Sequence, residues 1–76
     1  MNVERLILEC LDNVGSLAMP KTTLFSEVRL DAPGTSYTEF ESALRNLGRK
    51  GQVEVVPGED RDKVKILEAG AARLSE

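Results

Sequence analysis

The sequence predicts a small α+β domain in which three helices precede a two-stranded β-hairpin and a short fourth helix. Three observations support this fold class. Apolar residues recur at helical spacing in four stretches, a capping-box sequence begins the third of them, and two segments of period-two alternation flank a turn-rich loop. Because a chain of 76 residues is near the lower size limit for one hydrophobic core, we expect a single domain over residues 1–76.

The first helix is predicted from an apolar stripe near the N-terminus. Asn2 is a suitable N-cap, and Gly15 provides the left-handed conformation that ends a helix. Cys10 lies on the stripe and is expected to be a buried small hydrophobe, whereas Leu8 lies off the stripe and is expected to be exposed. The members of the stripe follow the spacing i, i+3, i+4 and are Val3, Leu6, Ile7, Cys10, Leu11 and Val14.

A short extended segment and a second helix are expected next. Pro20 favours an extended conformation in "SLAMP", residues 16–20, because proline disfavours helical structure in the residue before it. The second helix is predicted over about residues 21–30 and ends at "LDAPGT", where Pro33 and Gly34 interrupt helical structure. Its inward face consists of Leu24, Phe25 and Val28.

The third helix begins at a capping box, "SYTE". The Ser36 hydroxyl is placed to accept a hydrogen bond from the Glu39 backbone N–H, while the Glu39 carboxylate reaches back to the Ser36 N–H. We predict a helix over residues 36–50 that is ended by Gly51, with Gly48 costing about 1 kcal/mol relative to alanine. Its inward stripe consists of Phe40, Ala43, Leu44 and Leu47.

The segments "VEVV" and "KVKIL" predict a hairpin around "PGEDRD", over residues 53–67. If Val56 lies opposite Lys63, then Glu54 lies opposite Lys65 on the outer face, where opposite charges stabilise the pair. The residues expected to face the core are Val53, Val55, Val64 and Ile66. A short fourth helix follows, with an apolar face formed by Leu67, Gly70, Ala71 and Leu74.

The composition offers no catalytic constellation. The chain has one cysteine and no histidine, which excludes zinc sites of the usual spacing, histidine acid–base chemistry and Cys–His pairs. Glu39 and Glu41 face different directions on a helix, and Asp60 and Asp62 lie on an exposed tip, so neither pair makes an acid–base site. We therefore predict a protein that is not an enzyme and has no catalytic residues, metal or cofactor.

The chain shows no sign of a membrane span or a signal peptide. Its longest unbroken apolar run, residues 6–8, is far shorter than the roughly 20 residues that a spanning helix needs. The N-terminal "MNVERLILECLD" carries acids through its apolar part. We expect no membrane association and a cytoplasmic location.

Charge is unevenly distributed along the chain. The net charge of −3 argues against nonspecific nucleic-acid binding by the molecule as a whole. Six of the ten basic residues, however, lie between positions 45 and 65 with only four acids, a local balance of +2 against −5 elsewhere. We therefore expect the molecule to be a dipole.

The predicted order of helix, short strand, helix, helix and hairpin is that of a winged helix-turn-helix domain. The stretch "ALRNLGRKGQVEVVPGEDRDKVKILEAGAARL" resembles the recognition-helix and wing region of the MarR-like and PadR-like transcriptional regulators. In those families a helix ending in a leucine, a charged pair and a glycine leads into a strand, a wing with Asp and Arg, a second strand and "LTxxG". The resemblance covers roughly residues 36–74. It departs at Glu68, which replaces the threonine, and in the longer turn "DAPGTS".

The resemblance implies sequence-specific binding of double-stranded DNA by a transcriptional regulator. Residues 36–50 would be the recognition helix in the major groove, and residues 53–67 would be the wing on the adjacent backbone or minor groove. Arg45 would contact guanine, and Arg49 and Lys50 would contact phosphates. The candidate DNA-binding residues are Ser36, Tyr37, Thr38, Ser42, Arg45, Arg49, Lys50, Arg61 and Lys63.

Each candidate has a structural alternative. For Arg45 and Arg49 the alternative is solvation, since a charged outer face is common on soluble helices. The Tyr37 ring could cover the end of the core. Arg61 matches the wing arginine of the families, but acids surround it, so its alternative is a solvated loop. Lys63 could follow the phosphate backbone or be solvated.

The second functional hypothesis is a winged-helix protein–protein interaction module, or a subunit of a larger complex, that binds no DNA. The acidic balance favours it, and Leu8 and Val56 would then be contact residues. We also expect a monomer or weak homodimer, because no predicted segment resembles the long dimerisation helices of those regulators.

Overall fold

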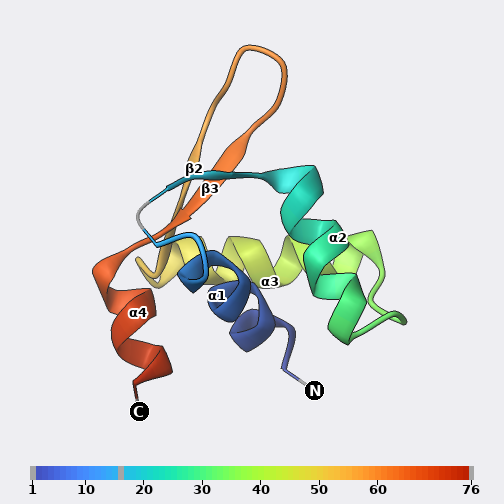
Figure 1. The fold of residues 1–76 in the computed structure, drawn as a ribbon, viewed down its shortest axis with the longest axis horizontal. Helices are drawn as coiled ribbons and strands as arrows, with labels where there is room; N and C mark the ends of the chain where they lie inside the picture. The colour runs from blue at the N-terminus through green and yellow to red at the C-terminus, as the bar shows by residue number, and fades with distance from the viewer. Residues whose placement is uncertain (1, 16, 76) are drawn as a thin grey trace.

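Four helices and a three-stranded antiparallel sheet follow one another along the chain in a small α+β fold (Figure 1). The computed structural model describes residues 2–15 and 17–75, so Ser16, the first residue of the predicted extended segment, lies outside the described residues. The elements are α1 (Val3–Asp12), β1 (Met19–Pro20), α2 (Lys21–Asp31), α3 (Tyr37–Arg49), β2 (Val53–Val56), β3 (Lys63–Ile66) and α4 (Glu68–Leu74).

The predicted capping signals set the ends of α1 and α3. The Asn2 side chain accepts from the Glu4 backbone N–H at 3.0 Å. The Ser36 hydroxyl accepts from the Glu39 N–H at 3.1 Å, and the Glu39 carboxylate accepts from the Ser36 N–H at 3.3 Å, which confirms the capping box. Gly15 and Gly51, one after each helix, have φ of 63° and 73°, the left-handed values expected of them.

The hairpin forms in the predicted register. Glu54 pairs with Lys65, and their side chains make an ion pair of 3.4 Å on the outer face. The sheet has one more strand than the predicted hairpin, since Met19 of β1 pairs with Val64 of β3 and gives the order β1-β3-β2. The β2–β3 hairpin extends away from the helices, and its tip lies well apart from them (Figure 1).

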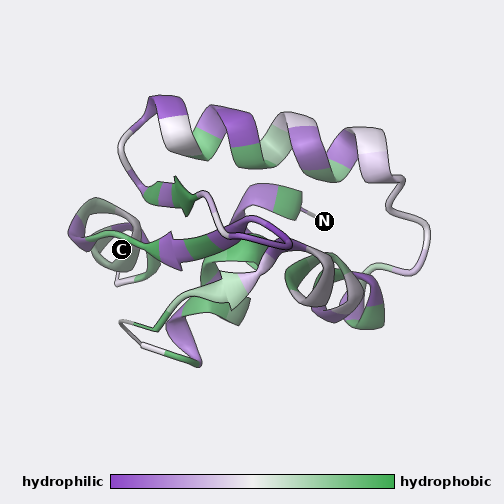
Figure 2. Ribbon diagram, turned by 90° about the horizontal axis from the view of Figure 1, so that it is seen from above, coloured by the Kyte–Doolittle hydropathy of each residue, from purple (hydrophilic) through white to green (hydrophobic). Residues whose placement is uncertain are grey.

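One hydrophobic core joins all the layers. Its largest fully buried side chains come from α1, α2, α3 and β3 and are Phe40, Ile7, Leu8, Leu11, Leu24, Leu47, Val28 and Val64. Seen from above, α3 runs along one side of the sheet, next to β2 (Figure 2). None of the described helices is long and apolar enough to cross a membrane.

The predicted burial of two side chains is wrong, and in both cases the cause is tertiary packing. Leu8 is fully buried, because α4 packs on the side of α1 that the apolar stripe leaves open and brings Gly70 against the Leu8 side chain. Val55 is 43% exposed although its neighbour in the same face, Val53, is buried. The hairpin rises away from α3 beyond Val53, so no helix covers Val55. Cys10 is half-buried against the core.

Candidate nucleic-acid interface

The outer face of α3 carries a stripe of exposed polar and cationic side chains. It lies opposite the buried face of the helix, and we call these residues the outer stripe: Thr38, Ser42, Arg45 and Arg49. The two arginines are four residues apart and therefore lie on successive helical turns. Neither forms an ion pair with any of residues 2–15 or 17–75. Both guanidinium groups are thus available to an anionic ligand.

The first residues of α3 have structural roles. The Ser36 hydroxyl is engaged in the capping box. The Tyr37 ring packs edge-on against Phe25, with centroids 5.1 Å apart, and the Lys21 ammonium lies 5.6 Å from the Tyr37 centroid. The tyrosine therefore covers the end of the core, as its structural alternative anticipated, although the side chain is still 45% exposed.

Glu41 on α3 is paired with a cation of α2. The Lys21 ammonium and the Glu41 carboxylate are 3.1 Å apart. The neighbouring Tyr37 hydroxyl and the Lys21 ammonium lower the pKa of Glu41. Partial burial opposes protonation of Lys21, but the interactions with Glu41 and Tyr37 raise its pKa overall. This ion pair reduces the repulsion that an unpaired Glu41 would exert on an anion near Arg45.

Lys50 is directed away from the outer stripe. Its ammonium lies 3.0 Å from the carboxylate of Glu4 on α1, and the same carboxylate accepts from the Arg73 guanidinium of α4, also at 3.0 Å. Hydrogen bonds from Lys50 and then Arg73 lower the pKa of Glu4. The structure therefore brings Lys50 into a cluster that joins helices and does not bring it to Arg45 and Arg49.

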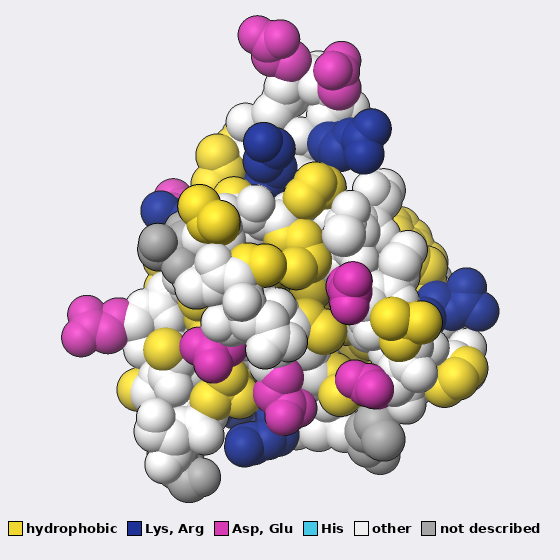
Figure 3. Space-filling view, viewed as in Figure 1, with side chains coloured by type: hydrophobic (Ala, Val, Ile, Leu, Met, Phe, Trp, Pro, Cys, Tyr) yellow, Lys and Arg dark blue, Asp and Glu magenta, His cyan; other side chains and the backbone are white. Residues whose placement is uncertain are grey.

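The remaining candidate cations lie on the hairpin. Arg61 and Lys63 are exposed and border the same shallow depression at the tip as Glu59 and Asp60. In Figure 3 two cationic side chains lie just below two acidic ones at this tip. A Cβ at Gly58 would collide with the Arg61 carbonyl, so glycine permits the tight turn that positions Arg61.

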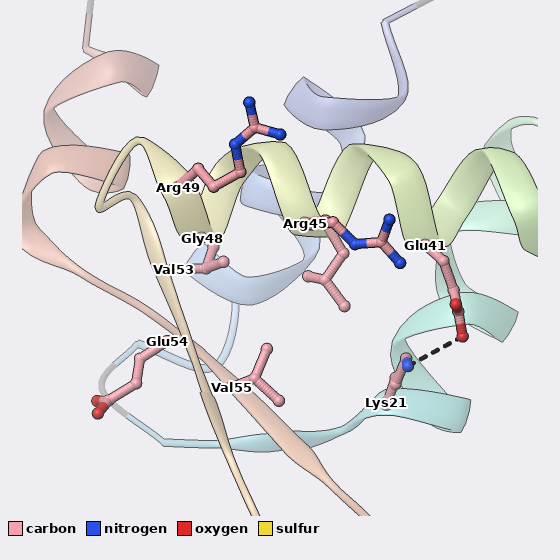
Figure 4. A pocket seen from close by; sticks show the side chains of 9 residues that line it. Lys21, Glu41, Arg45, Gly48, Arg49, Val53, Glu54 and Val55 are labelled. Carbon is pink, nitrogen blue, oxygen red and sulfur yellow. Dashed lines mark hydrogen bonds and ion pairs between the residues drawn. The ribbon is translucent and has the colours of Figure 1, made fainter.

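A groove between α3 and β2 is the feature that sequence reasoning missed. Its volume is about 520 Å³. The floor is apolar, and the rim carries the Lys21–Glu41 pair, the two arginines and Glu54 (Figure 4). The residues that form the floor are Leu44, Gly48, Val53 and Val55. Gly48 was the available signal in the sequence, because a glycine inside a helix is costly. The structure shows that a Cβ at this position would meet nothing within 4 Å.

Metal ligands and the free thiol are the remaining reactive groups to place. No group of three or more His, Cys, Asp or Glu side chains in residues 2–15 and 17–75 is arranged to hold a metal ion. Burial raises the pKa of the Cys10 thiol, and Glu27, Asp31 and Glu9 raise it further. The thiol is therefore a poor nucleophile at neutral pH.

Comparison of the chain with protein-family models, with curated proteins and with solved structures finds no match in any of the three. The function is therefore inferred from the arrangement of the side chains.

Proposed function

We propose that the chain is a winged-helix module that binds double-stranded DNA, with α3 as the recognition helix and the β2–β3 hairpin as the wing. The observation that carries the proposal is the outer stripe, in which Arg45 and Arg49 are exposed and form no ion pair with the described residues. The nearest acid, Glu41, has its pKa lowered by the charge of Arg45 but makes its ion pair with Lys21. The order of the elements and the position of the hairpin beside the end of α3 support the same fold type.

The dimensions of α3 suit a major groove. Its 13 residues span about 20 Å, and its outer stripe holds no apolar side chain. Arg45, in the middle of the helix, is placed to donate two hydrogen bonds to a guanine edge. Thr38 and Ser42 offer hydroxyls to bases or phosphates, and Arg49 offers a cation to the backbone.

The hairpin adds a second point of contact. Arg61 and Lys63 project from the same end of the sheet and are exposed. In this binding mode they contact the backbone or the minor groove beside the site read by α3. Lys50 and Lys65 do not take part, because Glu4 and Glu54 already pair with them.

The acidic side chains elsewhere fix the orientation. Glu9, Glu27 and Asp31 surround Cys10 where α1 meets α2. Figure 3 views the side on which α1 lies in front of α3, and acidic side chains are spread over its lower half. DNA would be repelled from this side, so the dipole directs α3 toward the phosphates.

Titration of the protein into random and genomic duplexes at several salt concentrations tests the proposal. Three cationic contacts to phosphates, from Arg49, Arg61 and Lys63, correspond to a slope of log affinity against log salt of about −3. Arg45→Ala should weaken the preferred duplex by about 1–3 kcal/mol and relax its sequence preference. Arg49→Ala should weaken all duplexes alike and reduce the slope by about one. Arg5→Ala, an exposed arginine of α1, is the matched control.

Two outcomes would contradict sequence-specific DNA binding through α3. One is affinity no tighter than nonspecific binding for every duplex tested. The other is a preferred duplex whose affinity is the same for wild type, Arg45→Ala and Arg49→Ala.

A protein-contact module is the second candidate. It is favoured by Leu17 and Leu30, which are 69% and 76% exposed, and by the carboxylates between α1 and α2. Buried Leu8 is not available for such a contact, whereas Val56 is. If this candidate is correct, substitution of Leu30 should abolish binding of the protein partner, whereas substitution of Arg45 should not.

A further inference from the structure

Arg45 has an acidic neighbour on its own helix. Glu41 precedes it by four residues, so the two side chains lie on successive turns of α3. A glutamate followed four residues later by a cation is the order that favours an ion pair on a helix surface. Both side chains border the groove beside β2, and Figure 4 shows Arg45 extended along α3 toward Glu41. The local sequence therefore favours a Glu41–Arg45 pair, which would occupy the guanidinium.

The structure gives the Glu41 carboxylate a different partner. It lies 3.1 Å from the ammonium of Lys21, the first residue of α2, and is turned toward that lysine (Figure 4). Arg45 forms no ion pair with residues 2–15 or 17–75. A contact from another helix thus overrides the local preference of α3.

The surroundings of Lys21 hold it in position for this contact. Its backbone N–H donates to the Asp62 carbonyl of the hairpin at 2.9 Å, and its ammonium lies 5.6 Å from the centroid of the Tyr37 ring. The Lys21 and Glu41 side chains are only 24% and 35% exposed, so salt screens this pair less than a fully exposed one. The Tyr37 hydroxyl and then the Lys21 ammonium lower the pKa of Glu41.

We propose that Lys21 is a positioning residue of the DNA interface, which holds the Glu41 carboxylate so that the Arg45 guanidinium stays free to donate to a guanine edge. This inference rests on the proposed function. Without the lysine, Glu41 would pair with Arg45 and would repel the guanine acceptors and the nearby phosphates. Lys21 acts through Glu41 and does not need to touch the DNA.

A double-mutant cycle tests this role, with DNA binding measured by fluorescence anisotropy. Lys21→Met should weaken binding of the preferred duplex about three- to tenfold and relax the preference at the base pair where Arg45→Ala relaxes it. In a Glu41→Gln background the same substitution should change the affinity less than about twofold, because no carboxylate remains to occupy Arg45. Lys21→Arg keeps a cation beside Glu41 and should restore most of the affinity.

The controls separate this role from changes in net charge and in folding. Arg5→Met removes the same charge from an exposed side chain of α1 and should change the affinity less than about twofold. Lys21→Met keeps the hydrocarbon stem and the backbone N–H, so its thermal melting curve should show a folded domain. Should it fail to fold, Lys21→Gln takes its place in the cycle.

An NMR titration of Glu41 provides a readout without DNA. In Lys21→Met, the further substitution Arg45→Ala should raise the pKa of Glu41 more than Arg45→Ala does alone, because Arg45 has replaced Lys21 as the partner of the carboxylate. Equal effects of Arg45→Ala in the two backgrounds would overturn the inference.

Two results with DNA would overturn the inference and leave the proposed function intact. One is wild-type affinity of Lys21→Met for a duplex that Arg45→Ala binds weakly. The other is an equal loss from Lys21→Met with and without Glu41, which would make Lys21 a direct contact. A wild-type protein that binds no duplex specifically would overturn the proposed function, and this inference with it.

Discussion

The burial of Leu8 and the exposure of Val55 show how far a residue's environment depends on distant chain segments. Leu8 is off the main apolar stripe of α1, yet α4, some sixty residues away in sequence, covers it. The Val55 side chain points to the same face of β2 as Val53, as the alternation predicts, yet it is 43% exposed because α3 does not cover it. Spacing along an element predicts which way a side chain points, but what lies opposite it is set by tertiary packing.

Substitution of Leu8 by alanine measures this difference directly. Because Leu8 is fully buried between α1 and α4, Leu8→Ala should lower the free energy of unfolding by about 2–5 kcal/mol. Urea unfolding followed by far-UV circular dichroism is the measurement. Leu30→Ala, at a leucine that is 76% exposed, is the control and should change stability by less than about 0.5 kcal/mol. Equal effects of the two substitutions would contradict the packing of α4 on α1.

At the scale of elements, one carboxylate links three helices. Glu4 near the start of α1 accepts from Lys50 at the end of α3 and from Arg73 in α4, and Arg73 also donates to Gln52. Gly70 permits the close approach of α4, because a Cβ there would collide with the Gln52 carbonyl. The small C-terminal helix is thus held by a polar cluster as well as by Leu8.

The Glu4 cluster should give a pH-dependent stability. The pKa of Glu4 is lowered in the folded state, so its contribution is fully present above the ordinary glutamate pKa and is lost as pH falls through the lowered value. Glu4→Gln should therefore cost about 1–2 kcal/mol at pH 7, and the difference from wild type should shrink as the pH falls below the ordinary glutamate pKa of about 4.3 and vanish below the lowered value. Chemical unfolding across this pH range measures it, with the exposed Glu27→Gln as control. A constant difference down to pH 3 would refute the assigned role.

The sequence predicted most elements because their signals are local. The capping box at Ser36, the glycines after α1 and α3, and the alternation in the hairpin each act within a few residues, and all three are confirmed. β1 was predicted only as an extended segment, since two residues show no period and the Met19–Val64 pairing joins distant parts of the chain.

The candidate interface was less predictable than the fold. The outward direction of Arg45 and Arg49 follows from the buried stripe of α3 alone. The pairing of Lys50 with Glu4 does not, because it depends on how α1 crosses α3. The groove beside β2 depends on the angle at which the hairpin leaves α3, which no local pattern determines.

At the scale of the whole molecule, the cations and the acids are mixed on most surfaces, and the outer stripe is the exception. Its charged members, Arg45 and Arg49, form no ion pair within the described residues. The hairpin tip carries Glu59 and Asp60 beside Arg61, and Glu9, Glu27 and Asp31 gather where α1 meets α2. The cations of the outer stripe would make two copies that meet α3 to α3 repel each other.

This arrangement predicts a monomer at micromolar concentration. A stable two-fold dimer buries about 800 Å² of each partner, a large share of the 4723 Å² surface of this domain. The large exposed apolar side chains are divided among four segments: Leu17 after α1, Leu30 on α2, Tyr37 on α3, and Val55 and Val56 on β2. Sedimentation at about 10 μM should therefore give the 8.3 kDa mass of one chain. A dimer that survives dilution would contradict this.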